Sequence, residues 1–302
     1  MCSSEDVGPD LFPTRDVHAI AILDIRTANC DRNEGNILVV GYGGGDRDGS
    51  WGGAESTSLV VCADTARRGR SGAIASPDAP RTWVAVMRSL TGPPMLAPAA
   101  TPGAPLFPGT SGRRAGEGGE AGRGRSVSAL LRGGGRVRLV PIDHGLILPH
   151  VGALDEVELA WLGWRAAGEP WSAGELAYIA ALDGAADAAL LGAAGGSCGG
   201  LRPESLVTLR ACTLLLQRGA AAGLTAREIG GFLVRNGDSP VSRMELCVAA
   251  ALAGAAAAAA GGGEASAFAL LEHLDEPLAA HIGAVLAARD AAGSRARART
   301  VS

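Results

Sequence analysis

Along the chain, apolar positions gather into two blocks that a long stretch with little pattern separates. In the first block, the apolar runs His18–Leu23 and Ile37–Val40 lie on either side of a polar turn over residues 24–36. Apolar runs of this length, bounded by turn residues, are typical of short strands. The second block opens with a third predicted strand, because residues 137–142 alternate between polar and apolar up to Asp143.

In the C-terminal half the apolar positions recur at helical spacing. Three S/T-x-x-E sequences predict helix starts, because the hydroxyl and the glutamate cap each other's backbone N–H groups. Apolar positions predict one helix over residues 206–217, ending near Gly223, and a last helix over residues 270–288. The Ala/Gly-rich stretch after Ala249 fits either a helix or a linker. The three predicted caps are Ser172 with Glu175, Thr225 with Glu228, and Ser242 with Glu245.

The stretch between the two blocks, residues 43–135, has a low-complexity composition. Glycine and proline make up 28 of its 93 residues, a share typical of segments that cannot bury enough apolar surface to fold. We expect a long disordered insert, with apolar islands at 58–62 and 83–87 as candidate strands. The predicted segments are an N-terminal tail (1–15), the first block (16–42), the insert (43–135), the second block (136–250), and an Ala/Gly-rich segment with a last helix and a basic, solvated tail (251–302).

The charged residues exclude some catalytic mechanisms and one class of partner. The chain has 302 residues and a net charge of -4, and all 27 of its basic residues are arginine. Without lysine, the chain has no Schiff-base lysine and no phosphate-binding lysine of its own. The mild acidity gives no electrostatic reason to expect nucleic acid as a partner.

Cysteine spacing and hydropathy predict the compartment. The six cysteines are scattered, with no C-x-x-C pair, so neither a zinc site nor a disulfide framework is indicated. The N-terminus is acidic and polar, unlike a signal peptide. The longest apolar run, residues 248–260, is mostly alanine and too short to span a bilayer. We therefore expect a soluble, cytoplasmic chain that is at most peripheral to membranes.

Two short motifs carry the candidate chemistry. Asp31 and Asn36 form a D-x-x-x-x-N sequence across a turn, and Asp143 begins a D-x-G sequence at the end of the third predicted strand. Phosphoryl transfer from ATP needs a carboxylate that takes the acceptor hydroxyl's proton, and an amide oxygen with a second carboxylate that hold Mg²⁺. Gly145 allows the chain to turn after Asp143. Alone, each motif also fits ordinary turn-forming residues.

The sequence segments around these motifs resemble those of the plant-type phosphatidylinositol 4-kinase gamma family. Residues 16–42 resemble its catalytic loop, with Asp31-Arg-Asn-Glu-Gly-Asn36 at the centre, and residues 139–149 resemble its metal-binding loop. Residues 161–183 and 224–231 resemble the helices that follow. The resemblance implies an α+β, protein-kinase-like fold in its lipid-kinase variant. It also implies ATP and Mg²⁺ as cofactors, and transfer of the γ-phosphate of ATP to phosphatidylinositol.

The resemblance also implies roles for individual residues. Asp31 would be the catalytic aspartate, and Asn36 and Asp143 would hold Mg²⁺ with its nucleotide. Structural roles are favoured for Asp24, at the end of a predicted strand, and for His144. The candidates for the acceptor side or the activation segment are His144, Gly145, Trp161 and Trp164; for the tryptophans we favour the core over a membrane interface.

Three departures from the family keep alternatives open. Asn33 and Glu34 replace the His and Ala of the family's D-R-H-A-G-N, and asparagine cannot take a proton. The 43–135 insert divides the two halves of the site. Only 15 residues precede Asp16, so we expect a mainly helical C-lobe without its N-lobe. The alternatives are a truncated or degenerate kinase lobe that only binds, an incomplete gene model, or protein Ser/Thr phosphorylation by the same site.

Overall fold

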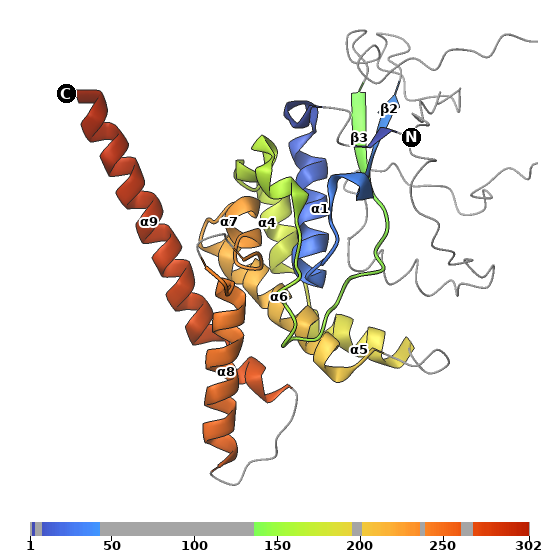
Figure 1. The fold of residues 1–302 in the computed structure, drawn as a ribbon, viewed down its shortest axis with the longest axis vertical. Helices are drawn as coiled ribbons and strands as arrows, with labels where there is room; N and C mark the ends of the chain where they lie inside the picture. Colours follow the sequence, from blue (N-terminus) through green and yellow to red (C-terminus); the bar gives the residue numbers. More distant parts are fainter. Residues whose placement is uncertain are drawn as a thin grey trace, which may run out of the picture.

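The structure is a computed structural model that describes residues 2–3, 8–42, 136–194, 201–235, 239–260 and 268–301. It is mostly helical, with one small sheet at the edge where the N-terminus lies (Figure 1). The predicted insert over 43–135 and its two candidate strands lie outside the described residues.

The sheet joins the two apolar blocks of the sequence. Its strands β1 (Cys2–Ser3), β2 (Ile37–Tyr42) and β3 (Arg136–Pro141) are antiparallel and follow that order. In β3, Val137 and Leu139 are buried and their neighbours are exposed, as the alternation predicts. Tyr42 pairs with Arg136, so the last described residue of the first block and the first described residue of the second lie side by side.

The first predicted strand is wrong, because residues 18–23 lie inside helix α1 (Thr14–Thr27). The helix is buried on almost every side, so its apolar residues form a run without a visible period of 3.6. A short apolar run of this kind does not distinguish a buried helix from a strand. The helix ends at Ala28, whose φ of 45° is left-handed.

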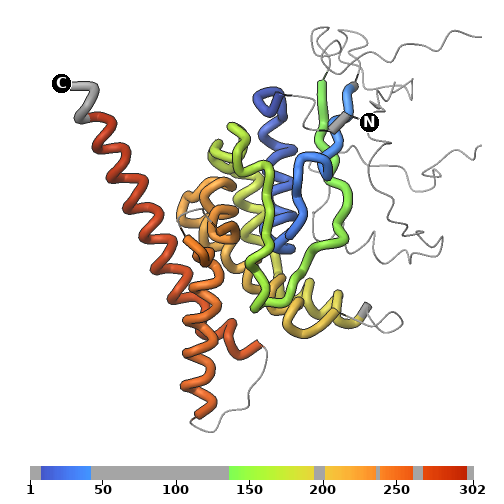
Figure 2. The backbone as a smooth tube through the Cα atoms, in the orientation of Figure 1, coloured from blue at the N-terminus to red at the C-terminus, as the bar shows by residue number. Residues whose placement is uncertain are grey.

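The helices of the C-terminal half form the body of the molecule, with α6 in contact with α1, α4, α5, α7 and α9 (Figure 2). All three predicted capping boxes are present, with both reciprocal hydrogen bonds. The α-helices are α4 (Ala173–Ala180), α5 (Gly184–Ala194), α6 (Pro203–Ala221), α7 (Ala226–Gly230), α8 (Arg243–Ala259) and α9 (Asp275–Val301). The 3-10 helices are η2 (Pro9–Leu11), η3 (Glu34–Asn36), η4 (Ala160–Gly163), η5 (Arg165–Gly168) and η7 (Ala269–His273).

The bounds of α8 and α9 test two predictions for the C-terminal segment. The alanine-rich stretch after Ala249 continues α8 to Ala259, so it is a helix there and not a linker. The last helix begins at Asp275, later than predicted, and runs through the arginine-rich tail to Val301. Its far end projects away from the body (Figure 1), and residues 291–297 are exposed.

The three tryptophans that the structure describes belong to the core. Trp161 is 0% exposed, Trp164 packs against Phe12, and the Trp171 Nε1–H donates to the carbonyl oxygen of Leu224. The membrane-interface alternative for these side chains is therefore wrong. Among the described residues, no single helix is long and apolar enough to cross a membrane; only the bent pair α4 and α5 passes that test jointly.

Candidate functional site

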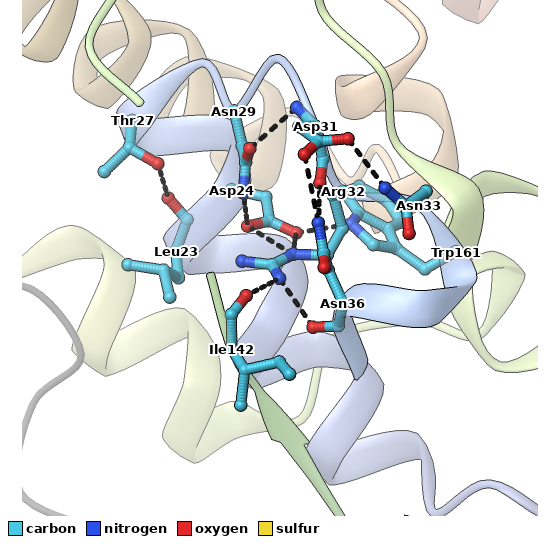
Figure 3. Close-up of polar contacts among 10 residues, drawn as sticks. All are labelled: Leu23, Asp24, Thr27, Asn29, Asp31, Arg32, Asn33, Asn36, Ile142 and Trp161. Carbon is cyan, nitrogen blue, oxygen red and sulfur yellow. Dashed lines mark hydrogen bonds and ion pairs between the residues drawn. The ribbon is translucent and has the colours of Figure 1, made fainter. Parts of the chain in front are cut away.

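The loop that joins α1 to β2 brings Asp31 and Asn36 together (Figure 3). The Asn36 Nδ2 donates to the backbone oxygen of Asp31 at 2.8 Å and to its Oδ2 at 3.2 Å. The 3-10 helix η3 turns the chain tightly enough for the five-residue spacing to close. Because the amide nitrogen makes both hydrogen bonds, the side-chain oxygen of Asn36 is the atom that remains for a ligand.

Asn33 contacts the carboxylate of Asp31 directly. Its Nδ2 donates to Asp31 Oδ1 at 2.6 Å, and the Asp31 backbone N–H donates to Asn29 Oδ1 at 3.0 Å. Asn33 thus orients the carboxylate, although an amide cannot accept a proton from it. The Asp31 side chain is partly exposed, so a ligand can reach it.

Beneath this loop lies an ion pair with no access to solvent. Asp24 on α1 and Arg32 are both 0% exposed, and Arg32 Nε donates to both carboxylate oxygens at 3.1 and 2.9 Å. Asn29 Nδ2 donates to Asp24 Oδ1 at 2.9 Å, and Trp161 Nε1 donates to Asp24 Oδ2 at 3.0 Å (Figure 3). The structural role favoured for Asp24 is confirmed, although it lies in a helix and not at the end of a strand.

Arg32 also connects the two halves of the candidate site. Its Nη1 donates to the carbonyl oxygens of Asn36 at 2.8 Å and Ile142 at 2.7 Å. The Ile142 N–H donates to the same Asn36 oxygen at 2.9 Å. Asp143 follows Ile142 directly, so the D-x-x-x-x-N loop and the D-x-G segment are neighbours, although about a hundred residues separate them in sequence.

Asp143 is exposed and has an unusual backbone conformation. Its φ is 50°, in the left-handed region, which turns the chain sharply as it leaves β3. Its Oδ1 accepts from the Gly145 N–H at 3.3 Å. The turn therefore occurs at Asp143 itself, and Gly145, whose φ is ordinary, follows it.

His144 is half-buried, and among the described residues its Nε2 has no hydrogen-bond partner. Burial lowers the pKa of His144 below its usual value, the charge of Arg32 lowers it further, and Asp24 and Asp143 oppose both effects. The imidazole is therefore neutral at pH 7.

The predicted site residues do not all meet. Asp31, Asn36 and the Asp143 segment lie together, whereas Trp161 supports the site from below through Asp24, and Trp164 packs in the core away from it. The sequence did not single out Arg32, because an arginine in a polar turn is normally exposed. The available signal was Asp24, a carboxylate within an apolar run that has to find a buried partner.

The donor set fits Mg²⁺ with a nucleotide better than a metal held by protein alone. In the parts of the chain that the structure describes, no group of three or more His, Cys, Asp or Glu side chains is placed to hold a metal ion. Mg²⁺ takes one or two carboxylates and completes its coordination with water and phosphate oxygens. The carboxylate of Asp143 and the amide oxygen of Asn36 are oxygen groups of the type that Mg²⁺ binds.

Sequence comparisons connect this arrangement to known proteins. Phosphatidylinositol 4-kinase gamma 4 of Oryza sativa subsp. japonica is 28% identical over 246 residues, which are 82% of this chain and 27% of that protein. The Arabidopsis thaliana protein of the same name is 29% identical over 80% of this chain and 26% of its own length. Phosphatidylinositol 4-kinase gamma 1 of Arabidopsis thaliana is 43% identical over 121 residues, 38% of this chain and 20% of that protein.

Two other comparisons found no match, and the relatives are much longer than this chain. No family model matches the chain, and no solved structure matches it significantly. The chain spans about a quarter of the length of the relatives that it matches most extensively. Over about four fifths of its own length, the chain is a homologue of the plant phosphatidylinositol 4-kinase gamma proteins.

Proposed function

We propose that this chain carries the phosphotransfer site of a phosphatidylinositol 4-kinase-like enzyme, which moves the γ-phosphate of ATP to a hydroxyl of phosphatidylinositol. One observation carries the proposal: Asp31 and Asn36 are hydrogen-bonded to each other, and their loop is joined to the Asp143 segment. A carboxylate base and two Mg²⁺ ligands are among the groups that phosphoryl transfer requires. The fold proposed with it is the helical C-lobe of the lipid-kinase variant of the protein-kinase fold.

In this mechanism Asp31 orients the acceptor hydroxyl and takes its proton as the hydroxyl oxygen attacks the γ-phosphorus. The bond from the γ-phosphorus to the β,γ-bridging oxygen breaks, and ADP leaves. Asn33 holds the carboxylate through its 2.6 Å hydrogen bond to Oδ1. Asn36 and Asp143 would hold Mg²⁺, which would supply positive charge against the charge that develops on the phosphate oxygens.

A basic group that contacts the phosphates is also part of this mechanism, and it is not a lysine of this chain, because the sequence has none. Among the described residues, Arg32 is committed to Asp24 and to two carbonyl oxygens. Within this chain, the groups left for the phosphate contact are its other arginines and backbone N–H groups.

The acceptor is part of the proposal. With phosphatidylinositol as the acceptor, the chain works at the cytoplasmic surface of a membrane, as a peripheral protein. A serine or threonine hydroxyl of a protein would meet the same carboxylate, because Asp31 needs only an alcohol at its oxygen. The two acceptors are distinguished by experiment below.

A second candidate is a lobe that binds nucleotide without transferring phosphate. Asn33 favours it, because this side chain occupies Asp31 Oδ1 and cannot relay a proton. Both candidates require nucleotide binding, and only the first requires turnover.

Radiolabelled ATP tests both candidates with the full chain. We expect label transfer to phosphatidylinositol vesicles in the presence of Mg²⁺, and its loss in Asp31→Ala and Asp143→Ala. Transfer to an added protein but not to the lipid would assign the acceptor to protein. Mg²⁺-dependent ATP binding without transfer would favour the second candidate. Absence of ATP binding would contradict both.

A further inference from the structure

Arg32 contacts every segment from which the candidate site is built. Its Nε holds Asp24 on α1, and its Nη1 holds the carbonyl oxygens of Asn36 and Ile142 at 2.8 and 2.7 Å. Asn36 is a proposed metal ligand, and Ile142 immediately precedes the other, Asp143. One guanidinium nitrogen therefore bridges the backbones that carry the two ligands (Figure 3).

The bridge is rigid for two reasons. Arg32 and Asp24 are completely buried, and Asn29 and Trp161 hold the Asp24 carboxylate in place. A guanidinium is planar, so fixing Nε also fixes the direction of Nη1. A buried ion pair costs desolvation that an apolar pair would avoid, so stability alone does not account for a charge here.

We propose that Arg32, anchored by Asp24, is a positioning residue that sets the spacing between the loop bearing Asp31 and Asn36 and the segment bearing Asp143. This inference rests on the proposed function, because it assigns a purpose to the spacing. The carbonyl oxygens of Asn36 and Ile142 both point at Arg32 Nη1 and repel each other. The shared Nη1 offsets that repulsion. Without it, the direct links described between the two segments are two hydrogen bonds of 2.9 Å, from the Ile142 N–H to the Asn36 oxygen and from the Cys30 N–H to the Leu146 oxygen, together with the pairing of Ile37 with Pro141.

The test is an Mg²⁺ titration of the full chain with a fluorescent ATP analogue as the probe. The variant is Arg32→Lys, because an ammonium keeps the charge beside Asp24 but cannot bridge two carbonyl oxygens at the same time. Residues that orient metal ligands typically change metal affinity by about 10–100-fold. We expect the half-saturating Mg²⁺ concentration to rise by about that factor, and any kcat to fall by about 10²-fold.

Arg26→Lys is the matched control. Arg26 is the other arginine that is 0% exposed in the described core. It lies on α1, the helix that carries Asp24, and it is paired with Asp187 on α5 and hydrogen-bonded to Thr213 on α6. A general loss of stability should affect both variants. Only Arg32→Lys should change the Mg²⁺ dependence, with Arg26→Lys within about threefold of the wild type.

A double variant keeps the inference testable if Arg32→Lys does not fold. Asp24→Asn with Arg32→Gln removes both buried charges together, so no unpaired charge remains, and it deletes the Nη1 bridge. A wild-type chain without Mg²⁺-dependent binding would overturn the proposed function, and the inference with it. A wild-type chain that binds, alongside variants with unchanged Mg²⁺ dependence or a control shifted equally, would overturn the inference alone.

Discussion

Gly230 is the position where the smallest substitution should disturb the candidate site. A Cβ added there would lie 2.6 Å from Trp161 Cη2 and 2.8 Å from Leu162 Cδ2, closer than real side chains approach. Trp161 is completely buried, so it cannot move into solvent. Overpacking of this kind costs about 1–3 kcal/mol. Alanine recovers about 0.5–1 kcal/mol of that through its helix propensity.

A displaced indole ring would also weaken the 3.0 Å hydrogen bond from Trp161 to Asp24. A hydrogen bond to a charged group contributes about 1.5–3 kcal/mol, and partial loss would bring the total for Gly230→Ala to roughly 2 kcal/mol. Urea denaturation followed by circular dichroism measures this difference directly. Because Trp161 reports on the ring environment, tryptophan fluorescence should change as well.

Gly283→Ala is the control for this experiment. Gly283 lies in α9, and an added Cβ there would meet no atom within 4 Å. The same substitution should therefore stabilise the chain slightly, by about 0.5–1 kcal/mol. If Gly230→Ala unfolds at the same urea concentration as the wild type, the packing argument around Trp161 is refuted.

Three further predictions concern the caps, acid stability and a thiol. Ser172→Ala should lower the free energy of unfolding by about 1 kcal/mol through loss of the α4 cap, and urea denaturation showing no loss would contradict this. The hydrogen bond from Arg235 holds the pKa of Glu245 at about 2 against the usual 4.5, so its stabilising effect is complete above pH 4.5 and is lost as the pH falls through 2. In Glu245→Gln this part of the acid sensitivity should be absent from a pH series of thermal melts. Burial, and then the charge of Glu156, raise the pKa of Cys30 to about 11, so alkylation mapped by mass spectrometry should be slow at pH 8 and faster in Glu156→Gln; rapid modification of wild-type Cys30 at pH 8 would count against this.

Local signals in the sequence were sufficient where the interaction itself is local. The capping boxes at Ser172, Thr225 and Ser242 use partners three residues away, and all three form. The contact between Asp31 and Asn36 spans one turn, and the structure contains it. Their roles in phosphotransfer, and that of Asp143, remain predictions.

Features that depend on residues far apart in sequence could not be predicted from short sequence patterns. Residues 18–23 were predicted as a strand and are helical, because burial on all sides removes the polar face by which a helix is recognised. From the sequence, Trp161 and Trp164 fitted either the protein core or a membrane interface. Their final position in the core depends on residues 50 or more positions away, such as Leu224, which accepts from Trp171.

The sequence by itself determined the chemistry available to this protein: an all-arginine set of cations, the aspartate and asparagine of one turn, and a relationship to the phosphatidylinositol 4-kinase gamma proteins. Only the tertiary structure decided how the two halves of the candidate site meet. Arg32 bonds to Asp24, eight residues away, and to Ile142, 110 residues away. A buried guanidinium finds its acceptors where the fold brings them, and that placement depends on the packing of α1 against β3.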